Sequence, residues 1–269
     1  MKIGNRIFEI GKETYIMGIL NITPDSFSDG GKYWTKDQAL RHAEKMIKEG
    51  ADIIDIGGES TRPGHVVISE QEEMERVLPV LELVRSNFEI PVSLDTYKSA
   101  VAQAGIQAGA DLINDIWGLR QEPDMARIIA KAQIPCCIMH NRAEASYGNF
   151  MREIIADFSQ SIQIAEEAGI REENIILDPG IGFGKSLQDN LKIMNKLEEL
   201  HMFGYPLLLG TSRKSMIGLT LDLPVEERLE GTLATTVIGV MKGVSFIRVH
   251  DVLENARAIK MTKSIINAE

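Results

Sequence analysis

The sequence predicts an α/β fold of the (β/α)8 type, a TIM barrel, in one domain over residues 1–269. Eight short apolar runs recur along the chain, and segments with helical spacing lie between them. Most runs are continuous Ile, Leu and Val sequences, which are typical of parallel strands covered on both faces. The predicted strands occupy residues 14–21, 51–57, 91–96, 111–116, 135–140, 174–180, 206–212 and 245–250.

The predicted helices carry start and stop signals. Segment 36–50 repeats apolar residues at helical spacing and ends at Gly50, which suits a helix C-terminus. Ser69 can cap a helix whose first turn is rich in carboxylates, as the positive end of a helix favours. Pro123 is expected in the first turn of another helix. The predicted helices occupy residues 36–50, 69–87, 100–109, 123–133, 150–168, 187–202, 225–242 and 251–266.

The leading segment 2–10 lies outside this alternation of strands and helices. We expect it to form a short hairpin that caps the bottom of the barrel. A doubly wound open sheet is the structural alternative. No Gly-x-Gly-x-x-Gly pattern follows the first predicted strand, and this disfavours the open sheet.

The composition excludes several classes of protein. A formal charge of -10 disfavours a nucleic-acid partner, because phosphate backbones require a broad cationic face, but it permits a small anionic substrate. No apolar run is long enough for a membrane span, and the N-terminus does not resemble a signal peptide. Cys136 and Cys137 are adjacent in an apolar run, which indicates two buried thiols in a cytoplasmic protein.

Polar residues collect where the predicted strands end, and barrels of this type form their active sites at those ends. A single Asp at such a position more often caps the next helix. Capping does not require Asn, Asp, Arg and His together, so the set indicates one site with carboxylates and amides in the middle and cations at the rim. Its members include Asn21, Asp95, Asn114, Asp115, His140, Asp178, Ser212, Lys214, Arg248 and His250.

At these positions the sequence resembles dihydropteroate synthase, a family of pterin-binding barrels. The resemblance covers essentially the whole chain and rests on several motifs in the right order, which makes it specific. The motifs are MGILNITPDSFSDGG (17–31), DIGGESTRPG (55–64), SLDTYK (93–98), LINDIWG (112–118), ILDPGIGFGKS (176–186), LLLGTSRKS (207–215) and IRVHD (247–251).

The resemblance implies a transferase of folate biosynthesis. Its reaction condenses 6-hydroxymethyl-7,8-dihydropterin diphosphate with 4-aminobenzoate, assisted by Mg2+, and gives dihydropteroate and diphosphate. A dissociative route is implied, in which diphosphate leaves first and the resulting pterin-methyl cation is then attacked by the aniline nitrogen. A homodimer is the family expectation, and helices 225–242 and 251–266 carry apolar residues widely.

The resemblance also assigns the pterin site and its chemistry. Carboxylates and amides can accept hydrogen bonds from the amidine-like edge of a dihydropterin. Asp178 would take that edge with Asn114 beside it, and Asp95 would lie near the reacting carbon and stabilise positive charge there. Lys214 would contact the ring carbonyl and N5. Met139, Phe183 and Gly210 would surround the rings, although core packing explains Met139 and Phe183 equally well from the sequence.

Other residues are implied for the diphosphate and for 4-aminobenzoate. Arg248 and His250 lie two residues apart, so both project to one side of their strand and suit a diphosphate. Asn21 would reach the diphosphate or its magnesium, together with Thr61 and Arg62. Ser215, early in the helix after the seventh strand, would hold the 4-aminobenzoate carboxylate. Phe27 and Pro63, with Thr61 and Arg62, would complete that pocket from two mobile loops, and sulfonamides should compete there.

The segment PGIGFGKS (179–186) nearly matches a P-loop. Pro179 stands where the first glycine is required, so the sequence disfavours an NTPase.

Two alternative functions are considered beside the synthase. A methyltransferase that passes a methyl group from methyl-tetrahydrofolate to a corrinoid protein would keep the pterin carboxylates without needing a diphosphate clamp. A catalytically silent paralogue is a third hypothesis. The sequence assigns no role to His140, Asp115 or Asp55.

Overall fold

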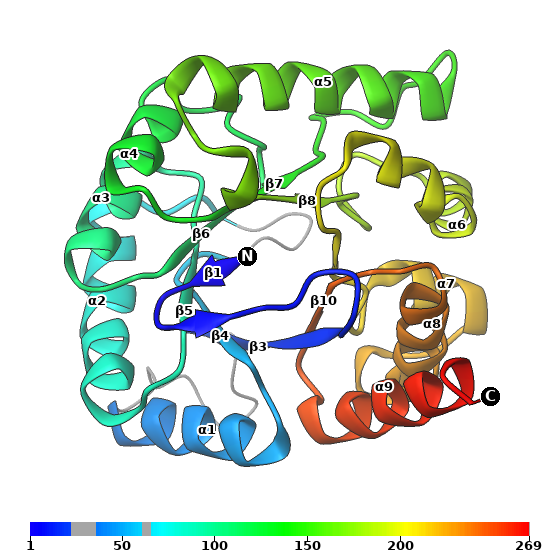
Figure 1. Ribbon diagram of the computed structural model, residues 1–269, viewed down its shortest axis with the longest axis horizontal. Helices are drawn as coiled ribbons and strands as arrows, with labels where there is room; N and C mark the ends of the chain where they lie inside the picture. Colours follow the sequence, from blue (N-terminus) through cyan, green and yellow to red (C-terminus); the bar gives the residue numbers. More distant parts are fainter. Residues whose placement is uncertain (23–35, 61–65, 269) are drawn as a thin grey trace.

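A computed structural model describes residues 1–22, 36–60 and 66–268, and Figure 1 shows strands at the centre with helices outside them. Eight strands pair in parallel in the order β8-β7-β6-β5-β4-β3-β10-β9. A parallel bridge between Leu177 and Leu207 joins the two ends of this sheet, so the strands close into the predicted barrel. The strands are β3 (Tyr15–Asn21), β4 (Ile53–Gly57), β5 (Val92–Asp95), β6 (Leu112–Asp115), β7 (Cys136–Met139), β8 (Ile175–Asp178), β9 (Leu208–Leu209) and β10 (Phe246–Val249).

The helices form the outer layer, and most begin within two residues of the predicted positions. Ser69 caps α2 as expected, because its side chain accepts a hydrogen bond from the Glu72 backbone N–H. Gly50 follows α1 with a φ of +107°, a conformation that glycine adopts without strain. The helices are α1 (Lys36–Glu49), α2 (Glu70–Asn87), α3 (Ser99–Gln107), α4 (Met125–Ala132), α5 (Phe150–Ala168), α6 (Leu187–Asn195), α7 (Ser215–Leu221), α8 (Leu229–Met241) and α9 (Val252–Ile266).

The structure corrects four helical details. The predicted helix 187–202 divides at Lys196 into α6 and the 3-10 segment η3 (Leu197–Phe203). A second 3-10 segment, η4 (Val225–Glu227), precedes α8. That helix begins at Leu229, so the predicted start at residue 225 was wrong by four residues. Helix α7 lies outside every predicted helical range, although Ser215 was expected early in a helix after the seventh strand. Pro123 lies in the turn before α4 and not in its first turn.

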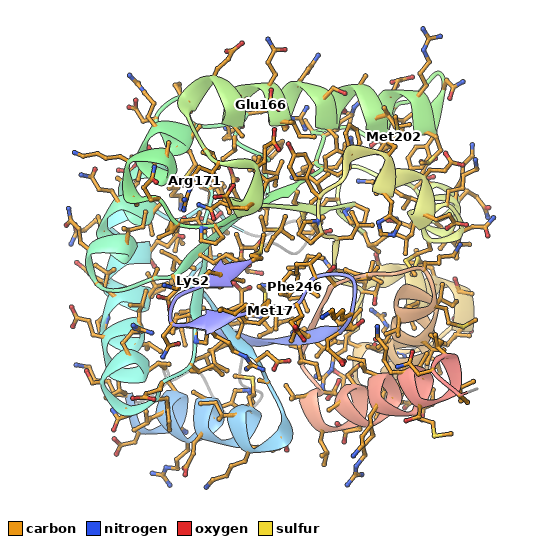
Figure 2. The ribbon with its side chains drawn as sticks, viewed as in Figure 1. Lys2, Met17, Glu166, Arg171, Met202 and Phe246 are labelled. Carbon is orange, nitrogen blue, oxygen red and sulfur yellow. The ribbon has the colours of Figure 1, made fainter. Side chains whose placement is uncertain are left out.

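The lower half of the barrel interior is apolar. Met17, Ile53, Leu112, Cys137, Ile176, Leu208 and Phe246 form one buried cluster with residues of the N-terminal hairpin. That hairpin pairs β1 (Lys2–Ile3) with β2 (Arg6–Ile7), and its fully buried Ile3 packs into the same cluster. Figures 1 and 2 show the hairpin lying across the ring of strands, close to Met17 and Phe246. The predicted cap on the barrel bottom is therefore confirmed.

Above this apolar lower half, which we call the floor, the next inward-facing residue of a strand can be polar. Residues two positions further along each strand face the same interior, because side chains alternate between the two sides of a strand. In β4, Ile53 in the floor is followed by Asp55, and in β10, Phe246 is followed by Arg248. The carboxyl ends of the strands thus carry the polar residues that make up the candidate site.

The two cysteines are buried, as their place in an apolar run predicted. Cys136 and Cys137 are both fully buried and free, and burial raises the pKa of each thiol above its usual value. In the part of the chain that the structure describes, no helix combines the length and the apolar character that a membrane span requires.

Candidate active site

Four neighbouring strand ends bring predicted site residues side by side. Asn21 of β3 lies opposite Gly57 of β4, and Gly57 lies opposite Asp95 of β5. Asp95 in turn lies opposite Asn114 of β6. Because all these strands run in the same direction, their ends open on one mouth of the barrel.

Arg248 adds a cation to this row from β10, the strand next to β3. Its Nε donates a hydrogen bond to Asp55 Oδ2 at 2.6 Å, and its Nη2 donates to Asp95 Oδ2 at 2.6 Å. The Asp55 side chain is fully buried and the Arg248 side chain is 16% exposed. The guanidinium therefore lies between two carboxylates inside the barrel, and neither of these two bonds uses Nη1.

Burial brings the pKa values of Asp95, Asp178 and Lys214 closer to neutral pH. Desolvation raises the pKa of Asp95 to about 7 although the Arg248 charge opposes this shift. Desolvation also raises the pKa of Asp178 to about 6, against the Gly180 N–H bond and the nearby Lys214. Burial, together with the Arg248 charge, lowers the pKa of Lys214 to about 8. Perturbed groups that gather at one mouth indicate a functional site.

Asp178 and Asn114 present hydrogen-bond acceptors inside the barrel. Asp178 Oδ1 accepts from the Gly180 backbone N–H at 2.7 Å, a bond that does not use Oδ2. Gly210 lies between Asp178 and Arg248, since a Cβ built on it would be 3.9 Å from Asp178 Oδ2 and 3.9 Å from the Cβ of Arg248. Asn114 donates to Asp55, whereas its buried Oδ1 has no hydrogen-bond partner among the described residues. An unused buried acceptor is costly unless a ligand or water pairs with it.

Lys214 and Phe183 face each other across this mouth. The Lys214 Nζ lies 4.1 Å from the centroid of the Phe183 ring, a cation–π contact. Lys214 is the residue before α7 and makes no side-chain cap there, so its side chain is directed elsewhere. Met139 ends β7 opposite Asp178 and is buried.

His250 and Ser215 lie at the edge of the same mouth. His250 follows β10, and its Nδ1 is 3.0 Å from Ser212 Oγ. Ser215 is the first residue of α7 and is exposed. Phe27, Thr61, Arg62 and Pro63 lie outside the described residues, as do Pro24, Gly30 and Gly31 of the first loop.

Several polar residues of the site had no assigned role at the sequence level. Asp55 is one of them, and in the structure it is buried and accepts the hydrogen bond from Arg248. Ser93 was not predicted at all, and its buried Oγ has no partner within the described ranges. Both precede a strand end by two residues, so the period of the strand was the signal that could have identified them.

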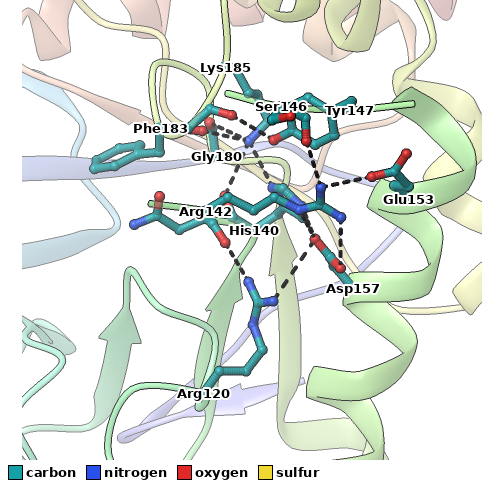
Figure 3. Close-up of polar contacts among 12 residues, drawn as sticks. Arg120, His140, Arg142, Ser146, Tyr147, Glu153, Asp157, Gly180, Phe183 and Lys185 are labelled. Carbon is teal, nitrogen blue, oxygen red and sulfur yellow. Dashed lines mark hydrogen bonds and ion pairs between the residues drawn. The ribbon is translucent and has the colours of Figure 1, made fainter. Parts of the chain in front are cut away.

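His140, Asp115 and Lys185 make structural contacts around the mouth. Asp115 accepts from the backbone N–H groups of Trp117 and Leu119, which closes the turn after β6. His140 Nε2 lies 2.9 Å from Asp157 Oδ2 on α5, and its Nδ1 lies 2.9 Å from Lys185 Nζ (Figure 3). Asp157 and Lys185 were given no role in the sequence analysis, since the spacing of residues does not reveal contacts between neighbouring βα units.

No group of three or more His, Cys, Asp and Glu side chains is arranged to hold a metal ion within residues 1–22, 36–60 and 66–268. Mg2+ often binds through only one or two protein oxygens and completes its shell with water and substrate phosphates. The side-chain Oδ1 of Asn21 lies at the end of β3, across Gly57 from Asp95. It can serve as one of the few protein ligands that such a magnesium site needs.

Comparisons with known proteins identify the family of this chain. The sequence profile of the pterin binding enzyme family matches residues 17–250. A dihydropteroate synthase of Clostridium beijerinckii is 61% identical over 99% of this chain and 99% of its own. The crystal structure of a dihydropteroate synthase from Clostridium difficile in the presence of pteroic acid superposes with a TM-score of 0.94 at 49% identity, and it covers 97% of this chain and 100% of that one.

A third similar protein is known with an inhibitor. The crystal structure of the Yersinia pestis dihydropteroate synthase with a sulfonamide drug complex superposes with a TM-score of 0.94 at 44% identity, and it covers 100% of this chain and 99% of that one. With the barrel, the polar strand ends and these matches, the chain belongs to the dihydropteroate synthase family of pterin binding enzymes.

Proposed function

We propose that this chain condenses 6-hydroxymethyl-7,8-dihydropterin diphosphate with 4-aminobenzoate, giving 7,8-dihydropteroate and diphosphate for folate biosynthesis. One observation carries the proposal furthest: at the mouth of a barrel of this family, Asp178 Oδ2 and the unpaired Asn114 Oδ1 offer acceptors near the cation of Lys214. A dihydropterin presents donors along one edge and a ring carbonyl beside them, which complements that set.

The pterin is proposed to lie across the polar upper half of the barrel. Its amino-pyrimidine edge donates to Asp178 and Asn114, while Lys214 donates to the ring carbonyl and N5 region. Phe183 and Met139 supply apolar contact to the ring faces, and Gly210 leaves room beside Asp178. The position of Lys214 over the Phe183 ring supports this arrangement, because both can then touch one flat ligand.

The diphosphate is proposed to occupy the rim near Asn21, Arg248 and His250. Arg248 can contribute Nη1 there without losing its bonds to Asp55 and Asp95. Thr61 and Arg62 belong to the same proposal. Asn21 would hold Mg2+, which, when bound, neutralises negative charge on the leaving diphosphate.

Asp95 is proposed to stabilise the positive charge that develops on the pterin methylene carbon. The carbon–oxygen bond to diphosphate breaks, the carbon–nitrogen bond to 4-aminobenzoate forms, and the amine releases one proton. Asp95 is nearly buried, so its charge acts through a medium of low polarity and has a strong effect on nearby charge. The Arg248 bond holds the carboxylate in place and favours its charged form.

The second substrate is proposed to approach from the side of Ser215. Ser215 is exposed at the start of α7, directly after Lys214, so a carboxylate bound there would place an aromatic amine toward the pterin site. Phe27 and Pro63 would complete that pocket. Sulfonamides are expected to compete with 4-aminobenzoate, and the drug complex of the Yersinia pestis protein supports this expectation.

A homodimer is also part of the proposal. Neighbouring helices α7, α8 and α9 expose large apolar side chains, and such a surface favours contact with a second copy. The exposed large apolar residues on these three helices are Leu219, Leu221, Ile238, Met241, Met261, Ile265 and Ile266.

The cytoplasmic location stays a prediction, consistent with two free thiols.

The proposed reaction is tested by diphosphate release. Purified protein is supplied with the pterin diphosphate and Mg2+, with and without 4-aminobenzoate, and diphosphate and dihydropteroate are both measured. We expect equal amounts of the two products when 4-aminobenzoate is present. Methyl transfer from methyl-tetrahydrofolate to a corrinoid in place of this reaction would support the methyltransferase alternative, and pterin binding without turnover would support a silent paralogue.

A further inference from the structure

The segment that resembles a P-loop, residues 179–186, lies beside the pterin site. Its lysine side chain bonds to the loop itself and to His140. Lys185 Nζ donates to the Gly180 carbonyl at 3.0 Å and to the Phe183 carbonyl at 3.0 Å, and it lies 2.9 Å from His140 Nδ1. A contact to the His140 carbonyl at 3.3 Å completes the set (Figure 3). Burial lowers the pKa of Lys185 to about 7, and in its protonated form the amine has three hydrogens that these four acceptors can use fully.

His140 is held in one neutral tautomer by Asp157, which contacts the ring nitrogen that Lys185 does not. Its Nε2 faces Asp157 Oδ2 at 2.9 Å, so Nε2 carries the hydrogen and Nδ1 accepts from Lys185. Burial lowers the pKa of His140 to about 4 despite the Asp157 bond, which agrees with a neutral ring. Arg142 binds Asp157 through two further hydrogen bonds, of 2.6 Å and 3.2 Å. Figure 3 shows this chain of contacts running from helix α5 to the loop after β8.

The loop that Lys185 holds also orients Asp178. The Gly180 backbone N–H donates to Asp178 Oδ1, and the Gly180 carbonyl accepts from Lys185. Gly180 has a φ of +66°, and a Cβ there would lie 1.9 Å from the His140 carbonyl oxygen, so the loop packs tightly on the end of β7. Both peptide groups of Gly180 are thus fixed, one by Lys185 and one by Asp178.

Lys185 also fixes the backbone of Phe183, whose ring is proposed to contact the face of the pterin. The Phe183 carbonyl accepts from Lys185, and the Phe183 ring lies under Lys214 Nζ. One side chain therefore sets the backbone on both sides of the turn from Gly180 to Phe183. That turn contributes to the orientation of one pterin acceptor and to the position of one ring contact.

We propose that Lys185, supported by His140 and Asp157, is a positioning residue for pterin binding, which holds the 180–183 turn so that Asp178 Oδ2 and the Phe183 ring meet the ligand together. The inference rests on the proposed function, because it requires a pterin at Asp178. It explains why a lysine follows the glycines of this loop without an NTP site.

A double-mutant cycle tests this role. The dissociation constant for 6-hydroxymethylpterin is measured by fluorescence titration for the wild type, Lys185→Met, Asp178→Asn and the double variant. We expect Lys185→Met to weaken binding about 10-fold, the order found when a supporting hydrogen bond of a site residue is lost. In the Asp178→Asn background the same change should weaken binding less than about two-fold, because coupled residues are not additive.

Two further variants make the result interpretable. Lys192→Met removes an exposed lysine from helix α6 and should bind pterin like the wild type. Lys185→Gln keeps two N–H donors and should lose less affinity than Lys185→Met, and it decides the question if the Met variant does not fold. Thermal unfolding confirms that each variant is folded.

Unchanged pterin affinity in both folded Lys185 variants would overturn the positioning role. An equal loss with and without the Asp178 carboxylate would also overturn it, because Lys185 would then act only on general stability. These outcomes differ from failure of the proposed function itself, in which the wild type would bind no pterin or would form no dihydropteroate from its substrates.

Discussion

Single residues at the strand ends combine two properties that rarely coexist in a protein interior, namely burial and charge. Asp55, Asp95 and Arg248 form an ion-paired group in which the cation has a carboxylate on each side. Such a group costs desolvation energy and is weak evidence for stability. We assign this ion-paired group an electrostatic role, because fixed charges in a poorly hydrated site act strongly on a reacting substrate.

Replacing Asp95 by Asn tests that electrostatic role. The amide keeps the shape of the side chain but removes the negative charge proposed to stabilise the pterin-methyl cation. We expect kcat to fall about 10²-fold or more while the protein stays folded. Asp37→Asn, a change at an exposed carboxylate of α1, is the control. Wild-type kcat in Asp95→Asn would contradict the role given to Asp95.

The protonation of Asp178 gives a prediction about pH. Burial raises its pKa to about 6, so below pH 6 the free protein carries a neutral carboxyl group that no longer accepts through both oxygens. Binding of a pterin edge then requires release of a proton. We expect the dissociation constant for 6-hydroxymethylpterin to rise by up to about tenfold for each pH unit below 6.

The same titration on Asp178→Asn is the control for that pH dependence. Its affinity is expected to be weak and to lack the tenfold change for each pH unit below 6, because no carboxyl group remains at this position. Use of the unphosphorylated pterin removes the titration of the diphosphate. A dependence on pH that is identical in the two proteins would assign it to another group.

The elements that position the site show what the sequence can predict. Each of the eight strands lies within a predicted run, because a buried parallel strand is a short continuous apolar sequence bounded by polar residues. The polar strand ends follow from the same pattern, so Asn21, Asp95, Asn114 and Asp178 were identified with their positions. Which of these residues pair with which was not predictable, because hydrogen bonds such as that from Arg248 to Asp55 depend on closure of the barrel.

The errors at helices have tertiary causes. Helix α7 contains Gly218, where a Cβ would lie 2.2 Å from the Arg228 guanidinium, so contact with a distant residue decides how this region folds. The helix ends at Leu221, and the following residue, Asp222, has a φ of +56°. Asp157 lies on the buried face of helix α5, three residues after Ile154, so its helical spacing was a signal of burial that the sequence analysis did not use. Its contact with His140 exists only in the folded protein.

The turn after β8 gives a prediction at the level of the element. Gly180→Ala adds a methyl group against the His140 carbonyl, so the turn must move and carry the Asp178 partner with it. We expect the dissociation constant for 6-hydroxymethylpterin to rise at least about tenfold. Gly169→Ala is the matched control, since Gly169 also has a positive φ, of +88°, and a Cβ there meets no atom within 4 Å.

The control separates backbone strain from displacement of the site. Alanine in a left-handed conformation costs about 1–2 kcal/mol, so Gly169→Ala should lower the free energy of unfolding by that amount and leave pterin affinity unchanged. Urea denaturation and the fluorescence titration give the two quantities. Equal loss of pterin affinity in both variants would show that strain alone explains the effect of Gly180→Ala.

The whole molecule has two different ends around one sheet. The lower end is closed by the N-terminal hairpin over an apolar floor, and the upper end carries the charged residues. This division lets one barrel supply both stability and a reactive site, as is general for barrels of this type. We propose that residues 1–269 form one domain, since strands from both ends of the chain share the sheet.

Association of two copies is the prediction that belongs to this scale. Met241 on α8 is 67% exposed, so Met241→Glu places a charge on the proposed contact surface. We expect the wild type to sediment as a dimer and this variant to shift toward monomer. Ile7→Glu, at an equally exposed position on the hairpin at the barrel bottom, should leave the dimer intact. A wild type that is monomeric at all concentrations would contradict the proposal.

The central claim is that the polar mouth of this barrel forms dihydropteroate by using Asp178 to hold the pterin. It is tested most directly by the rate of dihydropteroate formation from the pterin diphosphate, 4-aminobenzoate and Mg2+, measured for the wild type and for Asp178→Asn under the same conditions. The account predicts steady turnover with equal diphosphate release in the wild type and a loss of about 10²-fold or more in kcat/KM for the variant. No dihydropteroate from the wild type, or equal rates for the two proteins, would contradict it.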